Sequence, residues 1–343
     1  MNEIRANIDL LARDVTEQHA QLQPELFLRY GPIGKFRCRE DARFHLERLA
    51  AAVELSTPPL FIEYIAWAKI VLTTRGIPAA DLAQNLRILE EVLQQRVTGK
   101  TGAAASAILR AALNAFPSMP ADVPSHIDPA TELGRTAESY LEHLMGGRAS
   151  AAEALVRETL AKGQSIVEVY RGVLEPAQRE IGRLWQLNRV TVAQEHYCTA
   201  TTTRLVSELS ASSRSDTTSR QTVVAMCAAG EQHDLGLRLV ANVLESEGWR
   251  TLFLGANVPP ESAVAMCADQ RADLLLISAT VPVHIPAVAE AIRLVRAHPT
   301  LASSRVIVGG SAFQVHPQLW QHVGADAYAR SSKECLSLLD TLS

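Results

Sequence analysis

The stretch Gln221–Gly236, QTVVAMCAAGEQHDLG, decides the fold of the last third of the chain. It begins with an uninterrupted apolar run, Thr222–Ala228, which is typical of a strand buried on both faces of a parallel sheet. The run ends in a polar turn from Gly230 to Gly236, and an amphipathic segment follows. A buried strand, a polar turn and a helix in this order indicate the first unit of a doubly wound α/β domain.

The same alternation continues to the end of the chain. Further strands are predicted at short aliphatic runs, namely Thr251–Leu254, Leu274–Ser278 and Val306–Val308. Amphipathic helices are predicted between them, at Asp234–Glu247, Pro260–Asp269 and Ile285–Ala297. We therefore expect residues 221–343 to form a five-stranded, parallel, doubly wound domain of the flavodoxin-like Rossmann type.

Two seams divide the rest of the chain. Phe116–Pro129 contains four prolines and cannot continue a helix, and 210–220 is a polar run without periodicity, so both predict linkers. Residues 1–116 show helical periodicity without any strand pattern, and 130–209 show several apolar stripes separated by short glycine turns. The sequence thus predicts a multi-domain α plus α/β protein: an N-terminal all-helical domain, a four-helix bundle, and then the sheet domain.

Composition excludes several classes of function. The 343 residues carry a formal net charge of −4, and the first 116 show no recognition-helix pattern, so DNA is not an expected partner. No apolar run approaches the roughly 18 residues that span a bilayer, and the N-terminus is not a signal peptide, so no membrane partner is expected. The five cysteines are odd in number and scattered, which favours reduced thiols in a cytoplasmic protein.

Polar residues and glycines follow three of the predicted strands. In a doubly wound sheet, ligands bind outside the carboxyl ends of the strands, so these residues share one rim. Each has an ordinary explanation when taken singly, as a helix cap or a turn. Together they predict a ligand that has a metal and a nucleotide-like tail. They are His233 between Glu231 and Asp234, then Ser278 with Thr280, and then Gly309-Gly310.

These residues resemble the cobalamin-binding signature of methionine synthase, corrinoid proteins and mutases, and the resemblance runs through 221–343. The matching motifs are the turn from Glu231 to Gly236, which also contains Gln232 and Asp234, and the pairs Ser278-x-Thr280 and Gly309-Gly310. The resemblance implies that His233 is the lower axial ligand of the cobalt. It also implies that the dimethylbenzimidazole tail lies beside Ser278, Thr280 and the glycines. Those families usually carry aspartate where Glu231 stands, so the sequence alone leaves its contact with His233 open.

The second segment indicates what lies above the cobalt. Trp185, followed by Glu195-His196 after nine intervening residues, resembles the signature of cobalamin-dependent photoreceptors related to carotenoid-gene regulators. That resemblance implies that the tryptophan shields the upper face and that the glutamate contacts a 5′-deoxyadenosyl group. Taken alone, a bundle tryptophan is usually core and Glu195-His196 an ordinary surface pair. Gln186 stands where the best-known relatives have a histidine, so His196, another base or water would take the cobalt after photolysis.

The first segment gathers cationic and aromatic residues. Its stretch from Phe36 to Pro78 resembles the N-terminal region of the photocobilins, bacterial photoreceptors that combine cobalamin with a bilin. The resemblance implies biliverdin as a second chromophore, bound noncovalently, because nothing around Cys38 indicates a reactive thiol. The alternative is a solvated basic face beside core aromatics. The predicted bilin contacts, which would suit its propionates, are Arg37, Arg39, Arg43 and His45.

The combined prediction is a light sensor and not an enzyme. It would bind adenosylcobalamin and biliverdin, and it would change its self-association in the light. The chain has no room for the substrate barrel or second catalytic domain that a mutase or methyltransferase needs. The alternatives are a corrinoid carrier that serves a methyltransferase encoded elsewhere, and a cobalamin-storage module.

Overall fold

The computed structural model describes residues 3–212 and 221–342. The chain forms two compact units, one of 1–121 with 315–319 and one of 122–314 with 320–343. The predicted seam at 210–220 begins too early, because the helix before it continues to Ser212. The rest of that seam, 213–220, lies outside the described residues.

The first unit is helical, as predicted. Its helices are α1 (Glu3–Ala6), α2 (Ile8–Leu22), α3 (Pro24–Glu54), α4 (Pro58–Thr74), α5 (Ala79–Arg96) and α6 (Gly99–Ala115), followed by a short 3-10 turn at Phe116–Ser118. α3 is interrupted at Gly31-Pro32, where the glycine-proline pair predicts a break, and the helix resumes directly after the kink. Gly31 takes φ 63° and ψ −164° there, which supplies the bend that Pro32 requires. The core of this unit contains fully buried Leu46, Leu49 and Phe61.

The second unit begins with the predicted four-helix bundle. Its helices are α7 (Glu132–Met145), α8 (Ala149–Ala161), α9 (Ile166–Val169), α10 (Glu175–Gln186) and α11 (Val192–Ser212). A π-helical turn at Tyr170–Leu174 joins α9 to α10, so these two form one rod and four rods result. Gly147 and Gly163 take positive φ at the turns on either side of α8.

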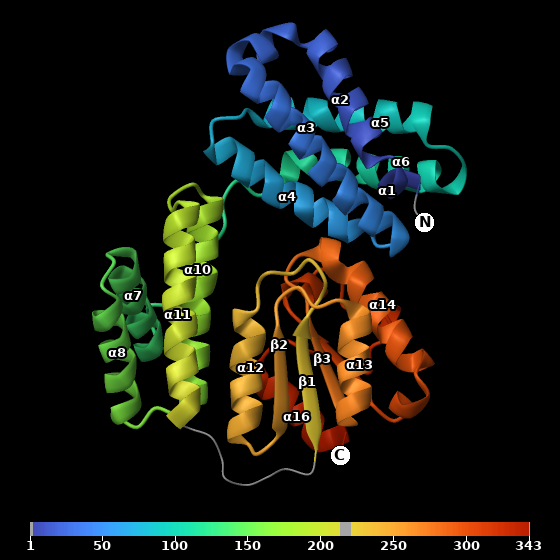
Figure 1. Ribbon diagram of the computed structural model, residues 1–343. Helices are drawn as coiled ribbons and strands as arrows, with labels where there is room; N and C mark the ends of the chain where they lie inside the picture. Colours follow the sequence, from blue (N-terminus) through green and yellow to red (C-terminus); the bar gives the residue numbers. More distant parts are fainter. Residues whose placement is uncertain (1–2, 213–220, 343) are drawn as a thin grey trace. The chain divides into compact units, whose positions relative to one another are not determined.

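The sheet domain has the predicted parallel, doubly wound architecture (Figure 1). Its strands are β1 (Thr222–Cys227), β2 (Arg250–Gly255), β3 (Leu274–Ser278), β4 (Arg305–Gly309) and β5 (Ala327–Ala329). Its helices are α12 (Leu235–Ser246), α13 (Pro260–Gln270), α14 (Ile285–Ala297), α15 (Leu319–His322) and α16 (Ser332–Leu342). The strand order is β2-β1-β3-β4-β5, and every pair is parallel. The order reverses between β1 and β3, so the ligand is expected at the carboxyl ends of these two strands.

The bundle packs against α12 of the sheet domain. Leu235, Leu239 and Val243 of α12 share one buried cluster with Tyr170 and Val206 of the bundle. The Asn242 side chain donates to the Tyr170 hydroxyl and to the Val206 carbonyl, both at 3.4 Å. The face of α11 that carries Val206 therefore packs toward the sheet domain, and other residues on this face lie on the same side of the helix.

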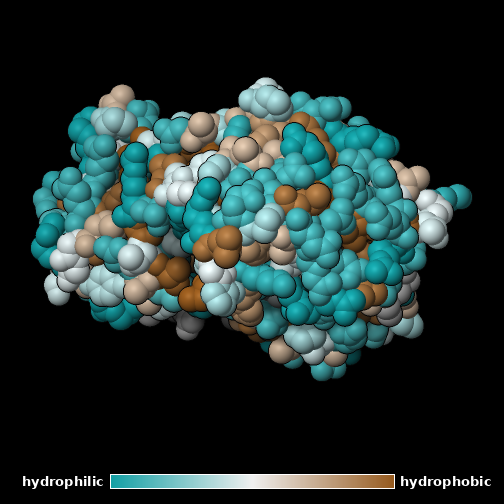
Figure 2. All heavy atoms as spheres, turned by 90° about the horizontal axis from the view of Figure 1, so that it is seen from above, coloured by the Kyte–Doolittle hydropathy of each residue, from teal (hydrophilic) through white to brown (hydrophobic). Residues whose placement is uncertain are grey.

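Apolar side chains reach the surface in several places among hydrophilic ones (Figure 2). The most exposed large apolar residues of the described chain include Leu28, Ile33 and Phe36 of α3. Among the described residues, no helix is long and apolar enough to cross a membrane.

Candidate functional site

Glu231 is the centre of the site and spans the point where the strand order reverses. It lies in the turn after β1 and is fully buried. Its Oε1 accepts from the His233 amide at 3.0 Å and from His233 Nδ1 at 2.5 Å. Its Oε2 accepts from the amides of Thr280 and Val281, at 2.7 and 2.9 Å, in the loop after β3. One carboxylate thus ties the ends of β1 and β3 together.

The pKa of Glu231 follows from these contacts. Burial alone would raise the pKa of this carboxyl, but hydrogen bonds from two histidines and two backbone amides hold it well below its usual range. Glu231 is therefore ionised, and a buried carboxylate of this kind is stable only because donors surround it.

The orientation of the His233 ring is fixed by Glu231. The bond to Glu231 raises the pKa of His233 against the opposing effect of burial, and the nearby Glu195 raises it further. Since Nδ1 donates to Glu231, Nε2 carries the lone pair of the neutral ring. The His233 side chain is 62% exposed, so this nitrogen can be reached from outside the sheet. The longer glutamate thus makes the contact that the sequence left open.

His284 was missed by the sequence reading. It ends the short 3-10 turn after β3, and its Nδ1 donates to Glu231 Oε2 at 3.0 Å. Its side chain is mostly buried and lies beside Gly230. The two histidines therefore hold opposite oxygens of one carboxylate. The available signal was its position six residues after Ser278, downstream of the same strand.

The remaining residues of the first turn surround this centre. Gln232 is exposed, and Asp234 stands at the N-cap of α12 without making a side-chain cap bond; its carboxylate faces Arg238 at 3.5 Å. Asn257, after β2, accepts from the Gly230 amide at 2.7 Å and was also missed. Gly236 opens α12, and a Cβ there would meet no atom within 4 Å. A hydrogen bond therefore fastens the turn to the loop after β2, while open space remains at Gly236.

The residues at the ends of β3 and β4 are brought to the same rim. Ser278 is buried and paired in register with Gly309, and the Thr280 carbonyl accepts from Ser311 Oγ at 3.1 Å. Gly310 takes φ 95°, and a Cβ there would overlap the Ala279 carbonyl. A side chain is excluded at Gly310 because the ends of β3 and β4 approach each other closely.

The bundle contributes the other side of the site. Glu195 lies in the first turn of α11, on the same helical face as Val206, and it is close enough to His233 to raise its pKa. Glu195 Oε2 accepts from Nδ1 of His196 at 2.5 Å, and the His196 side chain is 75% exposed. Trp185 is half-buried in the last turn of α10, whereas its neighbour Gln186 is buried.

A chain of hydrogen bonds runs from Glu195 into the bundle core. The Thr199 hydroxyl lies 2.9 Å from Glu195 Oε1 and 3.1 Å from Gln178 Oε1. Gln178 Nε2 donates to Thr202 Oγ1 at 2.7 Å, and the fully buried Tyr140 hydroxyl lies 2.9 Å from the same oxygen. Sequence reasoning missed these residues, although Thr199 is one turn after Glu195 and Gln178 two turns before Trp185. The bundle side of the site is thus connected through α10 and α11 to α7.

A pocket of about 270 Å³ lies on the opposite face of α11 from Glu195. Its lining is mainly apolar and comes from the last turns of α7 and the first turns of α11, including Leu144, Ala193 and Tyr197. It is therefore separate from the site that faces His233.

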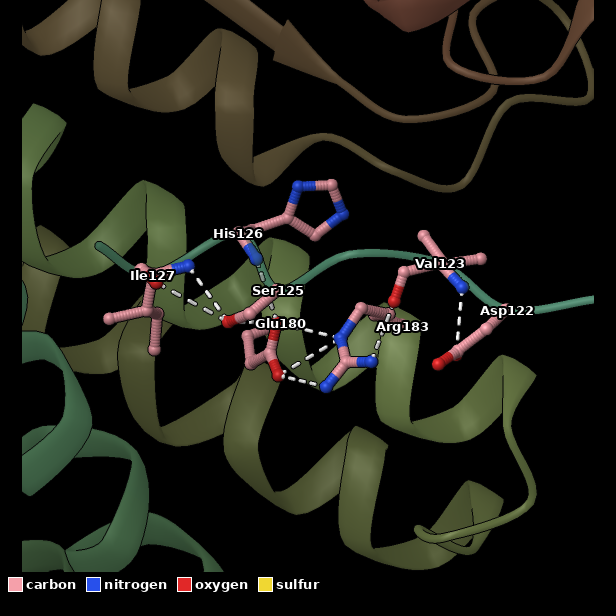
Figure 3. Close-up of polar contacts among 7 residues, drawn as sticks. All are labelled: Asp122, Val123, Ser125, His126, Ile127, Glu180 and Arg183. Carbon is pink, nitrogen blue, oxygen red and sulfur yellow. Dashed lines mark hydrogen bonds and ion pairs between the residues drawn. The ribbon is translucent and has the colours of Figure 1, made fainter. Parts of the chain in front are cut away.

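The face of α10 that carries Glu180 and Arg183 binds the linker that precedes the bundle (Figure 3). Glu180 is buried and accepts from Ser125 Oγ at 3.2 Å and from the His126 amide at 3.0 Å. Arg183 forms an ion pair with Glu180 at 2.7 Å and donates to the Val123 carbonyl at 2.8 Å. The helix that carries Trp185 is thus fastened to the segment that leads back to the first unit.

The predicted bilin contacts lie in α3 of the first unit in different environments. Arg37 pairs with Glu40 and Arg43 with Asp9, both on the surface, and Arg39 is exposed. His45 is buried instead and lies 2.9 Å from the Tyr64 hydroxyl through Nδ1. Burial, followed by the nearby Arg48, lowers the pKa of His45 to about 3, so this ring is neutral and part of the core.

The donor set fits a cofactor that brings its own metal. Among the described residues there is no group of three or more histidine, cysteine or acidic side chains that could hold a bare metal ion. His233 offers one oriented nitrogen at the switch point, with Thr280 and the glycine pair along the same rim. A single imidazole suits a metal whose other positions are already filled by its cofactor.

Comparisons with known proteins agree with this donor set. Residues 221–337 match a family model described as a B12 binding domain, and 136–210 match a second model of the same description. Dimethylamine corrinoid protein 1 of Methanosarcina acetivorans is 28% identical over 109 residues, which are 32% of this chain and 50% of that protein. The HTH-type transcriptional repressor CarA of Myxococcus xanthus is 28% identical over 190 residues, 53% of this chain and 62% of the repressor. The chain thus spans only half to three fifths of these relatives.

The monomethylamine corrinoid protein of Methanosarcina barkeri has the same fold in its solved structure. It superposes with a TM-score of 0.55 at 18% identity, over 61% of this chain and 99% of that protein. The two domain matches support cobalamin, with its cobalt, as the cofactor of this chain.

Proposed function

Because two regions of the chain match models of B12 binding domains, we propose that the protein is a light sensor that binds adenosylcobalamin. His233 is the lower cobalt ligand, and Trp185 and Glu195 face the upper side. The output is a change in self-association, and the protein works in the cytoplasm as a sensor rather than as an enzyme. DNA is not a partner, in keeping with the net charge of −4.

The observation that carries the proposal is the construction of the upper side. Glu195 lies on the face of α11 that packs toward the sheet domain, and its carboxylate accepts from the Thr199 hydroxyl, which also contacts Gln178 of the Trp185 helix. A carboxylate acceptor in this place suits the hydroxyl groups of a nucleoside. A carrier of a methyl group has nothing for such an acceptor to bind.

The cofactor supplies a cobalt–carbon bond that visible light breaks, and the residues of this chain supply the response. Glu231 keeps His233 oriented at the rim. Trp185 and Glu195 would lie against the upper group, so its loss would leave a void beside them, and a void in a packed site favours rearrangement. Because Gln186 is buried, we expect it to leave the vacated cobalt position to His196 or water.

Absorbance spectroscopy combined with size-exclusion chromatography tests this function. The protein loaded with adenosylcobalamin in the dark should bleach within seconds under green light and elute at a different volume. Protein loaded with hydroxocobalamin is the control and should do neither. A spectrum and an elution volume that ignore light would disprove the sensor.

The second candidate is a corrinoid carrier for a methyltransferase, which the match to a dimethylamine corrinoid protein favours. This function predicts that methylcobalamin binds as well as adenosylcobalamin and that transfer of the methyl group proceeds equally in darkness. A storage module predicts binding of either cofactor with no change in association.

We propose biliverdin as a second chromophore in the first unit. Tyr64 and Trp67 are stacked with ring centroids 6.1 Å apart, and the Arg48 guanidinium lies over the Phe44 and Tyr64 rings at 5.2 and 5.1 Å. Phe44 and Trp67 are 47% and 40% exposed, so this aromatic cluster reaches the surface. It suits a flat conjugated ligand, and the exposed arginines of α3 suit its carboxylates.

Expression beside a source of biliverdin tests the second chromophore. The protein should then show far-red absorbance that survives gel filtration and is lost on denaturation in acid, as noncovalent binding requires. Trp67→Leu should reduce this absorbance and leave the cobalamin bands intact. The absence of any far-red band in the parent would exclude a bilin.

A further inference from the structure

The two faces of α10 perform different tasks. Gln178, Gly182 and Trp185 are spaced by four and three residues and share one face of the helix. Glu180 and Arg183 lie on the opposite face, where they hold the linker residues Val123 to His126 (Figure 3). We name Gln178, Gly182 and Trp185 the ligand-side face of α10.

Hydrogen bonds assign this face to the cofactor site. The Gln178 amide contacts Thr199 and Thr202 of α11, and Thr199 contacts Glu195, which lies on the face of α11 that packs toward the sheet domain. Gly182 stands between Gln178 and Trp185, one turn from each. It is exposed, although it lies between two half-buried neighbours on this face.

Close packing within the protein does not require glycine at position 182. A Cβ at Gly134 would overlap the Asp128 carbonyl, and one at Gly172 would overlap the Leu133 side chain, so those helical glycines are needed for close contacts. A Cβ at Gly182 would meet no atom within 4 Å. Since glycine is the least favourable helical residue apart from proline, alanine would stabilise α10 at no steric cost.

The same is true of one other site residue. Gly236, three residues after His233 at the start of α12, also has open space where a Cβ would stand. Side chains are therefore omitted, without any need from the protein's own packing, at one helical position of the bundle side and one of the sheet side of the same site.

We propose that Gly182 is a specificity-determining residue, which leaves the room that a nucleoside-sized upper ligand of the cobalt needs. The inference rests on the proposed function, because it takes Trp185 and Glu195 to face that ligand. Hydroxo and methyl ligands are far smaller and do not reach this face. Bulk at Gly182 therefore discriminates between cobalamins that differ only in the upper group.

The test compares Gly182→Ala and Gly182→Leu with the parent as full-length chains in the dark. Dissociation constants are measured for adenosylcobalamin, methylcobalamin and hydroxocobalamin by equilibrium dialysis. Gly182→Leu should weaken adenosylcobalamin binding roughly tenfold or more and change the other two by less than about twofold. Gly182→Ala should show a smaller loss in the same direction, together with a higher midpoint of urea unfolding of the apoprotein.

Ala200→Leu is the control, because it places the same leucine side chain at an exposed position of α11 outside the ligand-side face of α10. It should leave all three dissociation constants unchanged. Equal losses for all three cobalamins in Gly182→Leu and Gly182→Ala, or no loss for any, would overturn the proposal. A parent that binds hydroxocobalamin but not adenosylcobalamin would instead refute the proposed function.

Discussion

The two sides of the site hold their carboxylates in very different ways. Glu231, on the sheet side, is fully buried and accepts from three backbone amides and two histidines. Glu195, on the bundle side, has a side chain that is 29% exposed, and its two hydrogen-bond partners, Thr199 and His196, both come from its own helix. The sheet side is thus fixed by several segments, and the bundle side by one.

This difference teaches which side can respond to a ligand. The donors of Glu231 come from the turns after two strands, so they keep His233 oriented whatever lies above it. Glu195 moves wherever α11 moves, and α11 is coupled to α10 through Gln178. We therefore expect a change of the upper ligand to shift the bundle helices and to leave the sheet side in place.

The largest expected effect comes from breaking the fixed side with Glu231→Gln. The amide keeps the size of the side chain but replaces one acceptor by a donor that faces other donors in a buried place. The free energy of unfolding of the sheet domain should fall by about 3 kcal/mol, since unsatisfied buried groups cost about 1–3 kcal/mol each. Urea unfolding followed by circular dichroism measures it, and hydroxocobalamin affinity should fall in parallel.

Glu231→Asp is the matched control, because it keeps the charge and shortens the reach by one methylene. It should lose less stability than Glu231→Gln. If the aspartate variant were the less stable of the two, reach rather than charge would explain the cluster.

The comparison extends to the first unit, where His45 is buried with one polar partner, the Tyr64 hydroxyl. Its pKa is lowered to about 3, so between that value and about 6.5 only the unfolded chain takes up a proton at this position. The unfolded state thus binds more protons, and stability falls as the pH falls through this window, by up to about 1.4 kcal/mol per pH unit. Urea unfolding of the full chain at about pH 7 and about pH 4.5 measures the loss, expected at about 2–3 kcal/mol.

His45→Gln supplies the reference for that measurement. Burial raises the pKa of Asp41 to about 6, and this carboxyl contributes with the opposite sign. Its effect is common to both proteins, so the difference between them isolates His45. An unchanged pH dependence in His45→Gln would show that the His45 ring is not neutral in the folded protein.

The fold was largely predictable because burial dictates it. Apolar runs such as Leu274–Ser278 and the helix Ile285–Ala297 are found at the predicted bounds, since each is apolar on the faces that its neighbours cover. The interruption of α3 at Gly31-Pro32 also lies where the glycine-proline pair predicts it. A single positive φ at glycine lets the helix resume after a proline, and local sequence does not reveal that.

The site was predictable where it follows strand ends and not where it depends on tertiary contacts. The sequence placed Glu231, His233 and Thr280 at one rim because parallel strands end together. It missed His284, which reaches Glu231 from 53 positions away, and Gln178, whose partners lie on another helix. The roles of Trp185, His196 and the α3 arginines stay predictions.

Substitution of His284 tests how much of the sheet side is needed for the proposed ligation of cobalt by His233. His284→Leu removes one donor from Glu231 Oε2 and leaves the Thr280 and Val281 amides in place. Hydroxocobalamin should bind about tenfold more weakly, about 1.4 kcal/mol, with less of the histidine-ligated absorbance spectrum. His284→Asn keeps a donor near the position of Nδ1 and should restore binding to within about threefold. Equal losses in both variants would mean that the bond to Glu231 is not what matters.

The smallest expected effect comes from loosening the side that responds. Thr199→Val keeps the shape of the side chain and removes the hydroxyl that lies between Glu195 and Gln178. Glu195 then samples more orientations, so adenosylcobalamin should bind about threefold to fivefold more weakly, up to about 1 kcal/mol, while hydroxocobalamin is unaffected. Thr199→Ser should restore the affinity.

Tyr140→Phe is the control, because it removes the hydroxyl at the buried end of the same chain of hydrogen bonds. It should lower the unfolding midpoint without changing the preference between the two cobalamins. If Tyr140→Phe changed that preference as much as Thr199→Val does, the whole chain of hydrogen bonds would position Glu195, and not Thr199 alone. The bundle side would then be more rigid than its contrast with the Glu231 side implies.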